Sequence, residues 1–177
     1  MKLFKLFAFG LLINIFISSY CFALDDVELA GDIVLAGLVG ATSGSIVYMK
    51  DKDGAVQYGE SALSNLGLTY GLKTTIDKKR PNGKKGSFPS AHTSVAFQNA
   101  VFVHKRYGLK KAIPLYLGAS FVGFSRVESK QHYVEDVLAG AGLGALCSMY
   151  FTKPTNVISV VPVVESKFYG VFVNLKW

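Results

Sequence analysis

Three short segments, KTTIDKKRP (residues 73–81), PSAH (89–92) and SRVESKQHYVED (125–136), are the part of the chain that best predicts its fold and chemistry. A phosphate group carries negative charge and several acceptor oxygens. A site that reacts with one therefore needs fixed cations, N–H donors, a nucleophile and a proton donor. The lysine, arginine, serine and histidine residues of these segments can supply all four. We therefore expect the segments to meet in one site.

The chain has the size and composition of one helical domain in or near a membrane. Its 177 residues are enough for one sizeable core. Half of them are hydrophobic and 18 are glycine, and the mean hydropathy is +0.33. This composition suits close-packed helices, and nothing in it indicates disorder.

Residues 1–23 have the pattern of a secretory signal peptide. Lys2 and Lys5 form a basic start, residues 3–17 are largely apolar, and the small-x-small sequence CFA (21–23) suits cleavage. The alternative is an uncleaved first transmembrane helix, because about 20 apolar residues span a bilayer. Both interpretations place the following residues outside the cytoplasm.

The formal net charge of +7 indicates an anionic lipid or a phosphorylated substrate as the partner. Nucleic acid is disfavoured because no exposed aromatic stripe or nucleic-acid-binding motif accompanies the basic residues. Cys21 would leave with the signal peptide, and Cys147 would stand alone in an apolar helix. We therefore expect neither a disulfide framework nor a Cys/His zinc site.

After the signal segment we predict an all-α fold, an antiparallel bundle of five helices. The predicted helices cover residues 27–49, 59–77, 91–106, 112–124 and 133–151. In such a bundle the second and fourth helices end where the third and fifth begin. All three phosphate-handling segments therefore fall at one end of the bundle.

Small residues recur four apart on three of these helices, as Gly40 with Gly44, Gly67 with Gly71, and Gly140 with Gly144. This spacing lets helix backbones approach closely, in membrane bundles and in soluble ones alike. If the bundle spans a bilayer, the basic turns at its other end face the cytoplasm and the site faces outward. Polar residues in the third helix and the shortness of the fourth argue against spanning.

The tail differs in pattern from the rest of the chain. Residues 157–164 and 168–177 are rich in β-branched and aromatic residues, and a polar turn separates them. This pattern predicts a β-hairpin. We therefore divide the chain into a signal segment (1–23), a helical domain (24–153) and a strand-like tail (154–177).

Within the first segment, Lys73 and Arg80 are the candidate phosphate-binding cations. They are seven residues apart, so they would share a helix face if the helix continued through both. A guanidinium can hold two phosphate oxygens, and an ammonium adds a movable point charge. We interpret Lys78, Lys79, Lys84 and Lys85 as a solvated basic cap.

The second and third segments contain the reactive groups. Ser90 is a good N-cap for the third helix, whose N-terminus would present N–H groups to an anion, and His92 could give a proton to a leaving oxygen. His132 and Asp136 are four apart on one helix face. A carboxylate bonded to one ring nitrogen leaves the other free to attack phosphorus, and Arg126 could neutralise the phosphate oxygens.

Taken together, these residues resemble the three-part signature of the type 2 phosphatidic acid phosphatase and vanadium haloperoxidase superfamily. The signature reads K-x(6)-R-P, P-S-G-H and S-R-x(5)-H-x(3)-D. The chain matches each part in order and in spacing, with Ala91 in place of the glycine.

The resemblance implies roles for eight residues. His132 would be the nucleophile that forms a phosphohistidine, Asp136 would orient it, and His92 would be the general acid. Further residues would bind the phosphoryl oxygens, namely Lys73, Arg80, Ser90, Arg126 and, through its backbone N–H, Ala91. The resemblance implies that no metal and no cofactor is needed.

From this we expect an exported phosphatase that hydrolyses a phosphomonoester or pyrophosphate, with a lipid-linked substrate favoured. It would lie in the cell membrane with its site facing the periplasm, or in the soluble periplasm. Three alternatives remain open: a soluble broad-specificity acid phosphatase, a vanadate-dependent haloperoxidase, and an inactive envelope protein that binds anions. The sequence does not indicate an oligomeric state.

Overall fold

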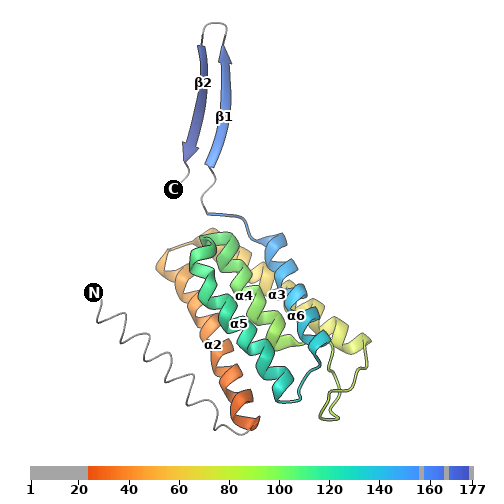
Figure 1. Cartoon of the computed structure of the whole chain (residues 1–177). Coiled ribbons are helices and arrows are strands. Elements are labelled where there is room, and N and C mark those ends of the chain that lie inside the picture. Colours follow the sequence, from red (N-terminus) through yellow and green to blue (C-terminus); the bar gives the residue numbers. More distant parts are fainter. Residues whose placement is uncertain (1–23, 156–157, 166–167, 176–177) are drawn as a thin grey trace, which may run out of the picture.

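The computed structural model describes residues 24–155, 158–165 and 168–175, with side chains described for residues 26–155. The predicted signal segment, residues 1–23, lies outside the described residues. The described residues form five helices (Figure 1), namely α2 (Leu24–Tyr48), α3 (Lys52–Thr75), α4 (Ala91–Tyr107), α5 (Leu109–Glu128) and α6 (Val134–Phe151). The all-α prediction with five helices is confirmed.

The predicted helix ends are least accurate at the start of α3, which begins at Lys52 instead of residue 59. From the sequence, residues 50–54 are expected to form a turn. The carboxylate of Asp51 accepts the backbone N–H of Gly54 at 2.9 Å, which is how an N-cap satisfies the free donors of a first helical turn. The polar sequence therefore turns the chain at residues 49–51, after α2, and its remaining residues already belong to α3.

Helix α4 lies at the centre of the bundle and contacts α2, α3, α5 and α6. Its Ala96, Ala100 and Phe102 are completely buried. The exposed large hydrophobic side chains of the described helices lie on α2, α3, α5 and α6, and none lies on α4. The outer faces of the four surrounding helices are therefore the apolar surface of the bundle.

Polar side chains occupy much of the interior, where they bond to one another. The Tyr58 hydroxyl donates to Asn99 Oδ1 at 2.8 Å, and the Ser148 hydroxyl donates to the Gln98 carbonyl at 2.6 Å. Gln98 and Asn99 are polar residues that argue against a membrane bundle at the level of sequence, yet both are buried. Their hydrogen bonds remove the cost of burying them, so the interior is polar where the outer surface is apolar.

Two of the described helices are long and apolar enough to cross a membrane, Asp26–Tyr48 and Val134–Phe151. Only 22% and 28% of the apolar 18-residue stretches in these two helices is buried within the bundle. Most of their apolar surface therefore faces outward. Length and composition alone are weak indications of a span.

One of the three glycine pairs makes the predicted close approach. A side chain at Gly140 or Gly144 would overlap the carbonyl oxygens of Ser90 and Ser94, so the backbones of α6 and α4 lie in direct contact. At the other two pairs, on α2 and α3, a Cβ atom would have no neighbour within 4 Å outside its own helix. The prediction is confirmed for α6 and wrong for the other helices.

The end of the bundle away from the three segments is held by an ion pair. Asp51 accepts from Arg106 Nε at 2.7 Å and from the Tyr107 hydroxyl at 3.0 Å. These contacts join the start of α3 to the end of α4.

Beyond the helices, β1 (Ile158–Glu165) and β2 (Phe168–Leu175) pair antiparallel, with Ile158 opposite Leu175. The side chains of this part of the tail lie outside the described residues.

The close approach of α6 to α4 predicts opposite effects for two glycine substitutions on the same helix. Gly144→Ala forces a methyl group against the Ser94 carbonyl and should destabilise the protein by about 1–3 kcal/mol. Gly142→Ala enters open space and should stabilise it by up to about 1 kcal/mol, because alanine is the better helix former. Thermal unfolding of both variants in detergent checks this, and equal effects would contradict the packing.

Candidate active site

The candidate site residues all lie at one end of the bundle. They are Lys73 in the last turn of α3, Arg80 in the following loop, Ser90, Ala91 and His92 at the start of α4, Arg126 in the last turn of α5, and His132 and Asp136 at the start of α6. Arg80 Nη1 donates to Gln131, the neighbour of His132, and the N–H of Ser90 donates to the Asp136 carbonyl. The three segments therefore meet.

Lys73 and Arg80 come together through a folded loop, because α3 ends at Thr75 instead of continuing through Arg80. Lys73 Nζ donates to the Gly86 carbonyl at 2.8 Å. Arg80 Nη1 donates to Gln131 Oε1 at 2.7 Å, while its Nε is buried without a hydrogen-bond partner among the described residues. The guanidinium therefore has a buried donor available for an anion.

Backbone contacts join the second and third segments. The N–H of Ser90 donates to the Asp136 carbonyl at 2.9 Å. Ser90 is the N-cap of α4, as predicted, but its buried hydroxyl makes no cap bond. The hydroxyl lies 3.0 Å from Thr93 Oγ1 instead.

Asp136 is completely buried, and its carboxylate is fully engaged. It accepts from Lys78 Nζ at 2.6 Å, from the Ser87 hydroxyl at 2.5 Å and from the Tyr133 N–H at 3.1 Å. Its Oδ2 is 3.9 Å from His132 Nδ1, which is longer than a hydrogen bond. The carboxylate therefore lies beside the ring, and the expected bond to it is not formed in this structure.

His132 is only 2% exposed, and its backbone N–H donates to the Arg126 carbonyl at 3.0 Å. Burial, followed by the positive charges of Arg80 and Lys73, lowers the pKa of His132 to about 4. The imidazole is therefore neutral at physiological pH, as a nucleophile must be.

Arg126 is also buried, and its guanidinium contacts α2. Its Nη2 donates to the Glu28 carbonyl at 2.6 Å, and its Nη1 lies 3.0 Å from Asp32 Oδ1. This contact needs Gly31, since a side chain there would overlap Ser125 and Arg126. The same Asp32 oxygen is 3.4 Å from His92 Nε2. Burial, then the charge of Arg126, lowers the pKa of His92 below 6.5.

Sequence reasoning missed four residues that contact the candidate site residues. Glu28 and Asp32 contact Arg126, Gln131 contacts Arg80, and Ser87 contacts Asp136. Asp32 interrupts an apolar helix, which was a usable signal because a buried charge needs a partner. Ser87 and Gln131 gave no signal of comparable strength.

The interpretation of Lys78 as part of a solvated basic cap is wrong. Besides Asp136, Lys78 contacts Glu135 at 2.8 Å, and its ammonium lies 4.7 Å from the centre of the Tyr133 ring. Lys85, by contrast, is 80% exposed and 3.9 Å from Asp77, as a solvated residue would be.

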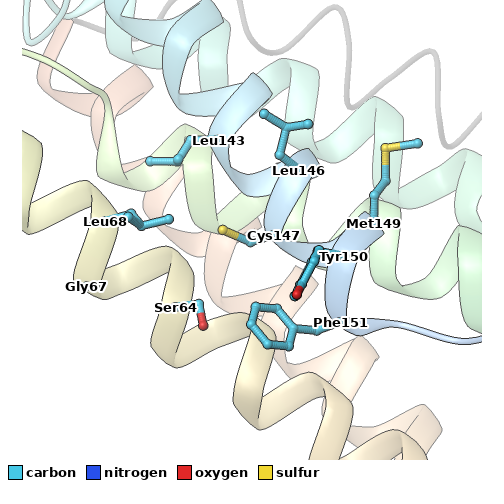
Figure 2. A pocket seen from close by; sticks show the side chains of 9 residues that line it. All are labelled: Ser64, Gly67, Leu68, Leu143, Leu146, Cys147, Met149, Tyr150 and Phe151. Carbon is cyan, nitrogen blue, oxygen red and sulfur yellow. The ribbon is translucent and has the colours of Figure 1, made fainter.

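A hollow of about 870 Å³ lies between α3 and α6, apart from the candidate residues (Figure 2). It is lined by Ser64, Gly67, Leu68, Leu143, Leu146, Cys147, Met149, Tyr150 and Phe151. Its walls are almost entirely apolar, and some of them, such as Leu68, Leu146 and Tyr150, are exposed on the outer faces of these two helices.

Comparison with known proteins identifies the family. The sequence profile of the PAP2 superfamily matches residues 54–156. The chain therefore belongs to the PAP2 superfamily, as its three-part signature predicted.

Particular relatives are phosphatases of lipids. The lipid A 1-phosphatase of Porphyromonas gingivalis is 37% identical over 84 residues, which are 45% of this chain and 19% of that protein. The lipid A 4'-phosphatase of Helicobacter pylori is 30% identical over 172 residues, 85% of either chain. The chain thus spans only about a fifth of the first relative and most of the second.

A solved structure is similar in fold as well. The transmembrane PAP2-type phosphatidylglycerolphosphate phosphatase of Bacillus subtilis superimposes with a TM-score of 0.52 at 28% identity. The match covers 72% of each chain.

The contacts of Lys78 predict that it stabilises the protein where Lys85 does not. Lys78→Met leaves the buried Asp136 carboxylate without its cation and should cost about 1.5–3 kcal/mol, the range for hydrogen bonds to charged groups. Lys85→Met removes an exposed pair worth at most about 1 kcal/mol. Denaturant unfolding of the two variants measures the difference, and equal small losses would show that Lys78 is solvated.

The burial of neutral His132 predicts a stability that depends on pH. Because its pKa falls from 6.5 to about 4 on folding, the unfolded chain takes up a proton in this window and the folded protein does not. The free energy of unfolding should therefore decrease as the pH is lowered from 6.5 to 4, and it should decrease less in His132→Gln. Melting temperatures measured at pH 7.5 and pH 5 test this. The control is His104→Gln, at the exposed opposite end of the bundle, whose melting temperature should drop between these two pH values as much as that of the wild type.

Proposed function

We propose that the protein is a metal-independent phosphatase that hydrolyses a phosphate ester through a phosphohistidine at His132. The observation that carries this proposal is the buried His132, 3.9 Å from Asp136, at the end of the bundle where Lys73, Arg80 and His92 also lie. Attack on a phosphate requires cations that bind the phosphate oxygens, and it requires an unprotonated nucleophile. Cations beside His132 serve both needs.

In the first step, a ring nitrogen of His132 attacks phosphorus. Its Nδ1 lies beside Asp136, so Nε2 is the nitrogen we assign to the attack. The N–P bond forms as the bond from phosphorus to the leaving oxygen breaks. The leaving oxygen keeps the bonding electrons and takes a proton from the His92 ring.

In the second step, water hydrolyses the phosphohistidine. The neutral His92 accepts a proton from water as the water oxygen bonds to phosphorus. The P–N bond breaks, its electrons return to the His132 ring, and both histidines regain their starting states. Lys73, Arg80 and Arg126 would balance the phosphoryl charge throughout, and the Ser90 hydroxyl and the backbone N–H of Ala91 would assist.

The lowered pKa of free His92 fits this cycle once substrate is included. In the structure, burial and Arg126 disfavour its protonated ring. A phosphate dianion bound to Arg126 and Arg80 would offset their charges and favour protonation. His92 would thus become an effective acid only with substrate bound.

A lipid phosphomonoester of the lipid A type is the substrate that we propose. Two relatives carry the names of lipid A phosphatases. The exposed hydrophobic side chains of α2, α3, α5 and α6, and the apolar hollow in Figure 2, form the kind of surface that acyl chains cover. We further propose that α2 and α6 lie in the membrane with the site end facing the periplasm, and that residues 1–23 direct export.

Removal of His132 tests the proposed function. Phosphate release from a lipid A-type phosphomonoester in detergent micelles should fall at least about 1,000-fold in His132→Ala, because the covalent intermediate cannot form. The matched control is His104→Ala, whose side chain contacts Tyr116 at the opposite end of the bundle and whose activity should stay near wild type. Near-wild-type release by His132→Ala would contradict the mechanism.

A further inference from the structure

Asp32 of α2 places one carboxylate oxygen against two groups of the site. Its Oδ1 lies 3.0 Å from Arg126 Nη1 and 3.4 Å from His92 Nε2. Arg126 is only 2% exposed, whereas Asp32 and His92 are each 44% exposed. Asp32 thus lies at the opening of the site, and the mechanism described above gives it no part.

A general acid must be protonated and correctly aimed at the moment of bond cleavage. The charged groups that face His92 are Asp32 and Glu28 on α2, Arg126 on α5 and Arg80 in the loop after α3. The two arginines disfavour a protonated ring and the two carboxylates favour it. Of the carboxylates, Asp32 lies against the ring, whereas Glu28 extends to Arg126 and Gln131.

We propose that Asp32 is a positioning residue that orients His92 and favours its protonated form as the proton donor. In this structure the 3.4 Å contact is not a hydrogen bond, because Asp32 Oδ1 has no hydrogen-bond partner among the described residues. When the ring is protonated, its Nε2–H donates to this carboxylate, which leaves the Nδ1–H to face the leaving oxygen. During the reaction the Nδ1 proton moves to that oxygen. Asp32 stays ionised, and its charge is balanced by Arg126. This inference rests on the proposed phosphatase function.

The same contacts also allow an opposite effect of Asp32. A carboxylate on Arg126 could compete with the substrate phosphate for that guanidinium. The two roles differ in sign: removal of the Asp32 charge lowers turnover if it supports His92, and raises substrate affinity if it competes.

Leaving-group dependence separates the roles. An alkoxide leaves poorly without a proton, whereas nitrophenolate is stable enough to leave unprotonated. Asp32→Asn should therefore lower kcat for hexadecyl phosphate about 10- to 100-fold, part of the range known for general acids. It should lower kcat for 4-nitrophenyl phosphate less than about 3-fold, by the same reasoning. Activity retained on the aryl ester also shows that the variant folds.

Two controls complete the experiment. Glu28→Gln also removes a carboxylate near Arg126 and should change the ratio of the two kcat values less than Asp32→Asn does, because Glu28 does not lie against the His92 ring. In a His92→Ala background, Asp32→Asn should cause no further loss on hexadecyl phosphate, because the two residues act as one unit.

Three results would overturn the proposal. These are equal losses on both substrates, a lower KM or higher turnover in Asp32→Asn, and an undiminished loss in the His92→Ala background. Wild type and His132→Ala are assayed alongside. If the wild type and His132→Ala have equal activity, the proposed function is wrong and the role of Asp32 is wrong with it. If only the role of Asp32 is wrong, the wild type still exceeds His132→Ala in activity.

Discussion

The direct backbone contact between α4 and α6 is the constraint on which the rest of the structure depends. Gly140 and Gly144 have no side chains to hold the two helices apart, so the start of α6 reaches the start of α4 and Asp136 accepts the N–H of Ser90. This contact sets the separation of the segments that carry His92 and His132. A bundle with ordinary helix spacing would move the two rings apart.

The distribution of charge around the site follows from the same geometry. The cations whose charges lower the pKa of His132 are Arg80 and Lys73, and each makes neutral contacts, to an amide and to a carbonyl. The carboxylates lie to either side, where Lys78 holds Asp136 and Arg126 holds Asp32. Because the central cations are not paired with these carboxylates, the positive potential at His132 is preserved, and the ring stays neutral.

The sequence predicted which residues gather at the site better than it predicted their contacts. Residue spacing within each segment was enough to identify Lys73, Arg80, His92, Arg126 and His132 as candidates, and alternating helices were enough to bring them to one end. Residue spacing was not enough to predict the contacts of Arg126, because its partner Glu28 is 98 residues away along the chain. Local spacing contains no information on such pairs, and helix packing decides them.

Two misinterpretations have the same physical origin. Lys78 looked like its solvated neighbours because a run of lysines gives no sign of which one faces a buried carboxylate. The glycine pairs on α2 and α3 looked like the pair on α6, although only α6 packs its glycines against a neighbouring backbone. In both cases the residue type permitted a contact, and the tertiary arrangement determined whether it formed.

The central claim is that distant segments form one phosphate site whose nucleophile is His132. Trapping the intermediate tests it most directly: the full chain is mixed briefly with substrate, quenched in alkali to preserve acid-labile phosphohistidine, and mapped by mass spectrometry. We expect phosphate on His132 and on neither His92 nor His104. A phosphate found on another residue, or complete turnover with no phosphorylated protein at any time, would contradict the claim.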